Sequence, residues 1–299
     1  MGEKILNLGT VHQCNCCLGG KTLHPLISVI DLSKAQLSPH TDIKFGFYTI
    51  LINECKCEAH AYGQQYYDYS DGALFCLTPG ESIDREKTKS EFPSKGWILA
   101  FHPDLISGTT LGMSIDNYSF FSYQPTEALH LSLREKQTLL ELLSKIDQEL
   151  QRYIDCHSKK IVSTYIELLL DYCTRFYERQ FITRCEANKK IIEQMNIIMD
   201  DYYETGKIKT HEMLSAEYCA DILQLSSNYL CDLLRYETGK FFGEYIQFKR
   251  FEIAKKWLLD TDKNVNQISK ELGFQNPQYF SRLFKKLTGF SPNDFRMPN

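Results

Sequence analysis

The sequence predicts an α+β protein with a β-rich N-terminal part and an all-α C-terminal domain that contains two helix-turn-helix units. Short runs of β-branched and aromatic residues, separated by turn signals, fill residues 1–130. After them, apolar residues recur every three or four positions, which is the spacing of amphipathic helices. A helix-turn-helix pattern then occurs twice. Leu230 and Gly239 of the first copy match Phe280 and Gly289 of the second, at an offset of 50 residues.

The composition is that of an ordinary globular protein. The 299 residues are enough for two domains, and 43% of them are apolar and 24% charged. There is no run of about 18 apolar residues that would predict a membrane span, and the N-terminus lacks the apolar segment of a secretion signal. The eleven cysteines therefore indicate reduced thiols and not a disulfide framework. We expect a cytoplasmic protein with no membrane partner.

The strand signals of the N-terminal part predict a small barrel or a sandwich. Residues 45–52 and 97–101 are β-branched and aromatic runs, and residues 72–80 indicate a short buried strand between turns. Turn signals stand at Ser70-Asp-Gly72 and Thr78-Pro-Gly80. Several short strands with turns at intervals are typical of both architectures.

Two amphipathic helices are predicted after the strands. Ser132-Leu-Arg-Glu135 is a capping box that opens the first helix. These helices either pack on the β-rich part or pair with a second copy of the chain. We place this helical dimerisation and linker region at residues 131–187 and the C-terminal domain at residues 188–299. The apolar stripe expected on one face of the second helix comprises Ile161, Tyr165, Leu168, Leu169, Tyr172 and Phe176.

In the first helix-turn-helix unit, residues 215–223 form the supporting helix, and Ser226 or Ser227 caps the second helix. Asn228 is a candidate for reading adenine, and Ser227 and Arg235 are candidates for contacts with the DNA backbone. Asp232 repels phosphates and accepts a hydrogen bond only from cytosine N4, so a solvated acidic position is the favoured interpretation. The positions expected to point outward are Asn228, Cys231, Asp232 and Arg235.

In the second unit, Gly273 permits the turn, and Asn276 caps a helix whose first residue is Pro277. Arg282 is the best candidate for reading guanine. We weigh the alternative, a solvated charged face, lower because the helix follows the expected turn and its surroundings are basic. Base contacts are expected from Gln278, Tyr279, Ser281 and Arg282, and phosphate contacts from Lys285 and Lys286.

The two units differ in charge. Residues 240–299 contain 11 Lys and Arg against 6 Asp and Glu, a net +5, whereas residues 190–239 contain 4 against 9, a net −5. Only the second half has the charge that a phosphate backbone favours. Residues 244–260 predict a spacer helix of about 25 Å, able to place two recognition helices in successive major grooves. On it, Lys249 is a candidate for a backbone contact, and Arg250 either touches the backbone or pairs with an acid such as Glu252.

The C-terminal residues resemble the signature of the AraC/XylS family of bacterial transcription regulators. The resemblance covers about residues 188–299. It implies a seven-helix DNA-binding domain that binds near promoters and touches RNA polymerase, and a cupin-like barrel with dimerising helices in the N-terminal half. Cys231 and Asp232 depart from the family pattern, which implies little direct readout by the first unit. The motifs that carry the resemblance are Arg250-Phe-Glu-Ile-Ala254, Leu272-Gly-Phe274, Tyr279-Phe-Ser-Arg-Leu-Phe-Lys285 and Ser291-Pro-Asn-Asp-Phe-Arg296.

No catalytic constellation is indicated, and we expect neither a metal nor a cofactor. The histidines of the N-terminal part, which include no His-x-His pair, are His12, His24, His40, His60 and His102. Cys14-Asn-Cys16-Cys17 and Cys55-Lys-Cys57 would bind zinc or sense oxidation if their thiolates converged, but ordinary thiols are favoured. A small-molecule effector remains open. The aromatic residues that either line its cavity or, as we favour, fill the core are Tyr48, Phe75, Trp97 and Phe101.

These observations predict a sequence-specific transcription regulator, an activator and not an enzyme, that dimerises through residues 1–185. Two other classes stay open. One is a cupin-type metalloenzyme fused to a DNA-binding domain, which a stoichiometric metal in the purified protein would support. The other is a protein-interaction adaptor whose helix-turn-helix units do not bind DNA, which the acidic first unit motivates.

Overall fold

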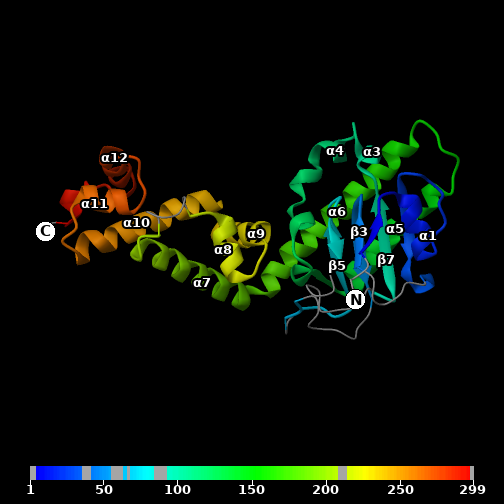
Figure 1. The fold of residues 1–299 in the computed structure, drawn as a ribbon, viewed down its shortest axis with the longest axis horizontal. Coiled ribbons are helices and arrows are strands. Elements are labelled where there is room, and N and C mark those ends of the chain that lie inside the picture. Colours follow the sequence, from blue (N-terminus) through cyan, green and yellow to red (C-terminus); the bar gives the residue numbers. More distant parts are fainter. Residues whose placement is uncertain are drawn as a thin grey trace. The chain divides into compact units, whose positions relative to one another are not determined.

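The computed structural model describes residues 5–35, 42–54, 63–65, 68–83, 93–207 and 214–296. The chain divides into two units, residues 1–185 and residues 186–299. The N-terminal unit combines strands with two long helices, and the described part of the C-terminal unit is helical (Figure 1). The expected order, a β-rich part before a helical one, is confirmed. Within the described ranges, no helix is long and apolar enough to cross a membrane.

The strands of the N-terminal unit form two sheets. The larger sheet has five strands in the order β2-β7-β4-β5-β8, all antiparallel, and the smaller has three in the order β1-β3-β6. In the smaller sheet β1 pairs with β3 in parallel. The strand bounds are β1 Ile5–Leu8, β2 Ile27–Asp31, β3 Asp42–Phe45, β4 Tyr48–Asn53, β5 Gly72–Leu77, β6 Ser82–Ile83, β7 Gly96–Phe101 and β8 Leu129–Leu131.

The described strands do not close into the cupin-like barrel that the family resemblance implies, and of the two predicted architectures they are closer to a sandwich. Among them the two sheets share no pairing, and β2 and β8 stay at opposite ends of the larger sheet. Layers form instead because the central strands are apolar on both faces. Ile98 and Ala100 of β7 belong to the core shared with the smaller sheet, and Leu99 and Phe101 belong to the core shared with the helices. Burial on both faces explains the unbroken apolar run at residues 97–101.

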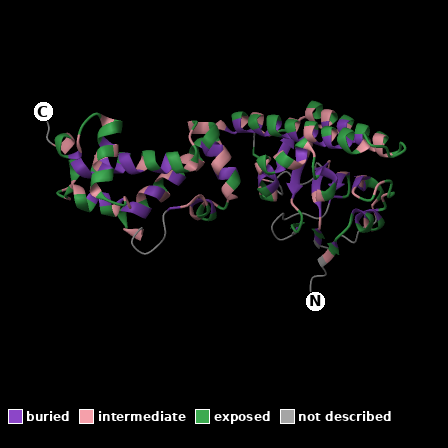
Figure 2. Ribbon diagram, turned by 90° about the horizontal axis from the view of Figure 1, so that it is seen from above, coloured by how far each residue is buried: buried purple, intermediate pink, exposed green. Residues whose placement is uncertain are grey.

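Helices cover the second face of the larger sheet. The predicted capping box opens α5 (Leu133–Leu150): the Ser132 hydroxyl accepts from the backbone N–H of Glu135 at 3.3 Å, and the Glu135 carboxylate accepts from that of Ser132 at 2.8 Å. α5 and α6 pack with the sheet into one core. Figure 2 shows the strands buried and the long helices exposed on their outer sides. The other α-helices described in this unit are α1 (Val11–Leu18), α3 (Pro103–Ile106), α4 (Thr110–Ser114) and α6 (Ser158–Thr183).

The apolar stripe predicted for α6 is partly wrong. Ile161 and Leu168 are 37% and 42% exposed, and Tyr165 and Tyr172 are half-buried. Tyr165 and Tyr172 pack partly against the core, and the fully buried stripe lies beside them, at Val162, Ile166, Leu169, Leu170, Cys173, Phe176 and Tyr177. The two stripes adjoin, and periodicity alone did not separate the face that meets the sheet from the face that stays exposed.

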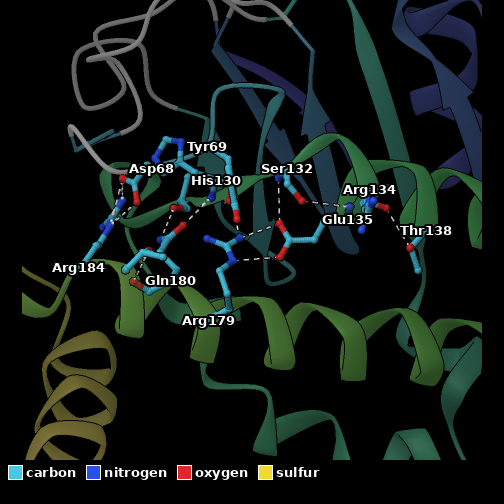
Figure 3. Close-up of polar contacts among 12 residues, drawn as sticks. Asp68, Tyr69, His130, Ser132, Arg134, Glu135, Thr138, Arg179, Gln180 and Arg184 are labelled. Atoms are coloured by element: carbon cyan, nitrogen blue, oxygen red, sulfur yellow. Dashed lines mark hydrogen bonds and ion pairs between the residues drawn. The ribbon is translucent and has the colours of Figure 1, made fainter.

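Two adjacent side chains fasten the C-terminal end of α6 to β8 (Figure 3). Arg179 makes a forked ion pair with Glu135, with Nη2–Oε2 and Nε–Oε1 distances of 2.8 and 3.0 Å, and donates to the carbonyl of His130 at 2.7 Å. The amide of Gln180 accepts from the backbone N–H of His130 at 2.7 Å and donates to the carbonyl of Ala128 at 3.0 Å. The end of α6 is therefore held in one register against the strand.

Arg184, which separates α6 from α7, is held by a buried ion pair (Figure 3). Its Nη2 lies 2.6 Å from Oδ2 of Asp68 and its Nε lies 3.0 Å from Oδ1, the fork geometry of a strong charged pair. The two side chains are 6% and 0% exposed. Arg184 also donates to the carbonyl of Gly63 at 3.3 Å. These contacts tie the last residues of the N-terminal unit to the chain before β5.

The helices of the C-terminal unit pack around one core. Figure 1 shows α8 and α9 at one end of α10, and α11 and α12 at the other. Phe251 of α10 lies between aromatic rings of the second helix-turn-helix unit, 6.2 Å from the ring of Phe280 and 5.6 Å from that of Phe274. The bounds are α7 Cys185–Glu204, α8 Ala216–Leu223, α9 Ser227–Thr238, α10 Phe242–Asp260, α11 Val265–Glu271, α12 Pro277–Thr288 and α13 Pro292–Arg296.

Candidate nucleic-acid interface

The second recognition helix, α12, begins and ends where the sequence predicts. Asn276 accepts from the backbone N–H of Tyr279 at 2.6 Å, and Pro277 is the first helical residue. Gly289, at a φ of 83°, ends the helix in the left-handed region. The turn before the helix uses Gly273 at a φ of 71°. Both ends are therefore determined by local residues, and the helix has only one rotation that buries its apolar side.

That rotation turns a polar, basic face outward. Phe280 and Phe284 are 0% exposed in the core, so residues on the opposite side of the helix point away from it. The guanidinium of Arg282 lies 5.7 Å from the centre of the Tyr279 ring, which is itself 41% exposed. The guanidinium and the ring therefore lie side by side on the exposed face. The exposed residues of this face are Gln278, Tyr279, Arg282, Lys285 and Lys286.

Ser281 is set apart from the other candidates. It is half-buried and borders a hollow of about 820 Å³ beside the start of α12. The guanidinium of Arg296 also borders this hollow, but it is committed to the backbone carbonyls of Leu258, at 3.1 Å, and Lys263. Sequence reasoning missed the hollow, because its walls come from three helices. Its other residues are Asn264, Val265, Asn266, Pro277, Gln278 and Asn293.

The first recognition helix, α9, is capped by Ser226, which accepts from the backbone N–H of Tyr229 at 3.2 Å. Ser227 is then the first helical residue and half-buried. The turn before it places Gln224 at a φ of 56°, the left-handed conformation that a glycine supplies in the second unit. Asn228 and Arg235 are exposed, and Asp232 is half-buried. These three share a face because they are spaced by four and three residues.

The outward face of α9 is less suited to DNA than that of α12. The guanidinium of Arg235 lies 4.7 Å from the centre of the Phe241 ring, at the end of the helix. On the supporting helix, Glu217 and Asp221 are exposed acids. Carboxylates on this surface repel phosphates, whereas the lysines and arginine of α12 attract them. The residues that give the two halves of the repeat their different charges therefore lie on the surface.

The basic residues of α10 differ in their burial and in their ion pairs. Lys249 is half-buried, and the ammonium groups of Lys255 and Lys256 pair with Glu252 at 2.8 Å and with Glu204 at 3.2 Å. Neither of the roles expected for Arg250 is correct. Its side chain is buried, with the guanidinium 3.9 Å from the centre of the Phe274 ring.

Arg250 is therefore part of the core. Its Nε and Nη2 atoms are buried without a hydrogen-bond partner among the described residues. Burial lowers the pKa of the guanidinium, because the charged form is poorly solvated there. The single aromatic residue Phe274 that follows α11 in the sequence does not by itself specify a cation–π contact with Arg250.

The described histidines and cysteines form no metal site. No group of three His, Cys, Asp or Glu side chains converges within the described ranges. Cys14 is buried, which raises the pKa of its thiol to about 12, so it is a poor thiolate donor. Cys16 is exposed, with its sulfur 3.6 Å from Nε2 of His12. Cys55 and Cys57, like His40 and His60, lie outside the described residues.

The four aromatic residues considered for an effector cavity are mostly core. Phe75 and Phe101 are buried, and Tyr48 stacks on Phe101 with ring centres 5.2 Å apart. Trp97 differs, because it borders a hollow of about 550 Å³ between the edge of the larger sheet and α5. Lys21 and Asp147 are among the other residues of that hollow.

Comparison with known proteins identifies a helix-turn-helix domain in the C-terminal region. A helix-turn-helix domain family model matches residues 219–297. The chain is 39% identical over 111 residues to the uncharacterized HTH-type transcriptional regulator YtdP of Bacillus subtilis (strain 168), a match that covers 37% of this chain and 14% of that protein. It is 25% identical over 228 residues to the uncharacterized HTH-type transcriptional regulator YijO of Escherichia coli (strain K12), covering 75% of this chain and 76% of that protein.

The chain is also similar to solved structures. The C-terminal domain of AraT, a response regulator from Geobacillus stearothermophilus, is 28% identical, with a TM-score of 0.29 over 36% of this chain and 83% of that one. Against the first two curated relatives, the aligned region spans less than a quarter of their length, 14% and 23%.

Proposed function

We propose that this protein is a sequence-specific, DNA-binding transcription regulator of the AraC/XylS type, since a helix-turn-helix domain family model matches residues 219–297. The observation that carries the proposal is α12. It is capped at both ends, fixed in rotation by Phe280 and Phe284, and exposes Gln278, Arg282, Lys285 and Lys286. A helix with that face fits the major groove, where side chains reach base edges and flanking cations reach phosphates.

We assign each candidate residue to a base or to a phosphate from its position on the helix and its chemistry. Arg282, in the middle of α12, reads guanine through O6 and N7, and Gln278 and Tyr279 reach neighbouring bases. Ser281 borders the hollow and contacts a base or a sugar at the edge of the interface. In the first unit Asn228 reads adenine. The residues that we assign to phosphates are Ser227, Arg235, Lys249, Lys285 and Lys286.

The deciding experiment is a salt titration of full-length protein on duplex DNA from upstream of its own gene, comparing wild type with Arg282→Ala. Binding should weaken steeply with salt, because bound cations displace counterions from DNA. Arg282→Ala should cost about 1–3 kcal/mol of binding free energy on the specific site, and much less on random DNA.

Arg134→Ala is the matched control for this titration. It removes the same charge from an exposed position of the N-terminal unit, so its binding should equal that of the wild type. Equal losses for Arg134→Ala and Arg282→Ala would show that only net charge matters. A folded protein that binds neither its upstream DNA nor genomic fragments would favour the adaptor function.

The finer parts of the proposal concern regulation. The protein acts in the cytosol as an activator that touches RNA polymerase, and it binds DNA as a homodimer. The exposed edge of this stripe of α6, at Ile161 and Leu168, supports the dimer, whereas Tyr165 and Tyr172 beside them are half-buried against the core. Apolar side chains at helical spacing outside the core are typical of a contact with a second copy. A small-molecule effector would act on the N-terminal unit.

The dimer is tested by Leu168→Glu. A carboxylate in the middle of this stripe should weaken self-association at least about tenfold, because a buried, unpaired charge is costly. Sedimentation equilibrium of full-length protein measures the change. Leu133→Glu, at another exposed leucine, should leave the association unchanged. A monomeric wild type, or equal association of all three proteins, would exclude this stripe as the dimer contact.

A further inference from the structure

The two recognition helices are built in one frame, so each outward position of α9 has a counterpart in α12. Both helices have 12 residues. In each, the capping side chain accepts from the backbone N–H of the third helical residue, and a glycine in the left-handed conformation ends the helix. The offset between counterparts is 50 residues throughout. Residues at equal positions of α9 and α12 therefore occupy equivalent places on the two recognition helices.

In this frame Asp232 stands where Arg282 stands in α12. Each is the sixth residue of its helix, one turn after Asn228 or Gln278 respectively. Leu230 and Leu234 are 0% exposed and fix the rotation of α9, so that the side with Asp232 and the exposed Asn228 faces away from the core. An acid thus occupies the central reading position of the first unit.

We propose that Asp232 is a specificity-determining residue that selects cytosine in the major groove read by α9. This inference rests on the proposed DNA-binding function. A carboxylate only accepts hydrogen bonds. In the major groove cytosine offers its N4 amine as a donor, whereas guanine and thymine present the acceptors O6, N7 and O4. Adenine offers N6 but places N7 beside it, which repels the second carboxylate oxygen.

The preference for cytosine comes from the hydrogen bond to its N4 amine and from a desolvation penalty at the other bases. A carboxylate placed against a base without a donor is desolvated and gains no hydrogen bond from that base, so other sequences are disfavoured. The surroundings add a repulsion of phosphates that is independent of base sequence, because residues 190–239 carry a net charge of −5. Arg235, the basic residue on the same face, lies over the Phe241 ring. The two units then read G·C pairs differently, Arg282 through guanine and Asp232 through cytosine.

The test is selection of full-length protein on a library of random duplexes, followed by sequencing of the bound DNA. Four proteins are compared: wild type, Asp232→Asn, Asp232→Ala and Arg282→Ala. Wild type should enrich cytosine at one position in one groove and guanine at a position in the other. Asp232→Asn should change the preferred base from cytosine to adenine, by about tenfold in relative affinity, because asparagine pairs with adenine N6 and N7. Asp232→Ala should abolish the preference there, and Arg282→Ala should abolish only the guanine preference.

The outcomes separate this inference from the proposed function. If Arg282→Ala changes the selected motif and both Asp232 variants select the wild-type motif, Asp232 does not read a base, while the regulator function stands. If the Asp232 variants bind every sequence more tightly with unchanged base ratios, the acid only repels phosphates, and the inference is again overturned. If wild type, folded by circular dichroism, enriches no motif, the DNA-binding function itself fails.

Discussion

Replacing Asp68 by alanine is expected to destabilise the N-terminal unit by about 3–5 kcal/mol, because it leaves the buried guanidinium of Arg184 without its counter-charge. The Asp68 carboxylate is 0% exposed and holds the guanidinium through Oδ1 and Oδ2. Urea unfolding of full-length protein, followed by circular dichroism and tryptophan fluorescence, measures the loss. Both tryptophans serve as probes, since Trp97 reports on the N-terminal unit and Trp257 on the C-terminal unit.

Asp104→Ala is the matched control for this substitution. The Asp104 carboxylate is 75% exposed and pairs with a partly exposed histidine, so its loss should change the free energy of unfolding by less than about 0.5 kcal/mol. Replacing Asp68 and Arg184 together by apolar residues should restore part of the stability, because no charge is then left buried. If Asp68→Ala and Asp104→Ala cost the same small amount, the ion pair contributes little.

Phe280→Ala is expected to destabilise the C-terminal unit by about 3–5 kcal/mol, through lost burial and the cavity left behind. The ring is 0% exposed, and its centre lies 4.9 Å from that of Phe274 and 5.6 Å from that of Phe284. Because this cluster sets the rotation of α12, specific DNA binding should fall with stability. Unfolding followed at Trp257 measures the first effect, and binding to duplex DNA below the unfolding transition measures the second.

Phe290→Ala removes a ring that is 55% exposed just after α12. It should leave the free energy of unfolding within about 0.5 kcal/mol of the wild type. A loss of stability equal to that of Phe280→Ala would mean that the aromatic cluster does not determine where α12 lies. A stable Phe280→Ala protein that still binds specifically would lead to the same conclusion.

The internal repeat allows α9 and α12 to be compared position by position. Asn228 and Gln278, Asp232 and Arg282, and Arg235 and Lys285 occupy equal positions on two helices of equal length. The residues that build the frame are alike in type, but one outward pair, Asp232 and Arg282, is opposite in charge. We therefore expect the two units to make unequal contributions to binding, with α12 supplying most of the affinity.

Local residues by themselves determined the helices of the C-terminal unit and their ends. Asn276 with Pro277, Ser226, and the glycines at positions 273, 239 and 289 act within a few residues of their own position, so the sequence predicts these caps and turns correctly. The same holds for the capping box at Ser132. The outward faces of α9 and α12 follow from apolar spacing, since the helix period relates sequence to direction.

Only the tertiary structure decided which elements meet. The β-branched runs predict strands but not their pairing partners, so the two open sheets in place of a barrel became clear only from the register. Likewise Arg250, expected on the surface, is buried against Phe274, and Arg184 pairs with Asp68 across 116 positions of the chain. Local sequence sets backbone conformation and amphipathic direction, whereas these contacts join residues distant in the chain and depend on how the whole core packs.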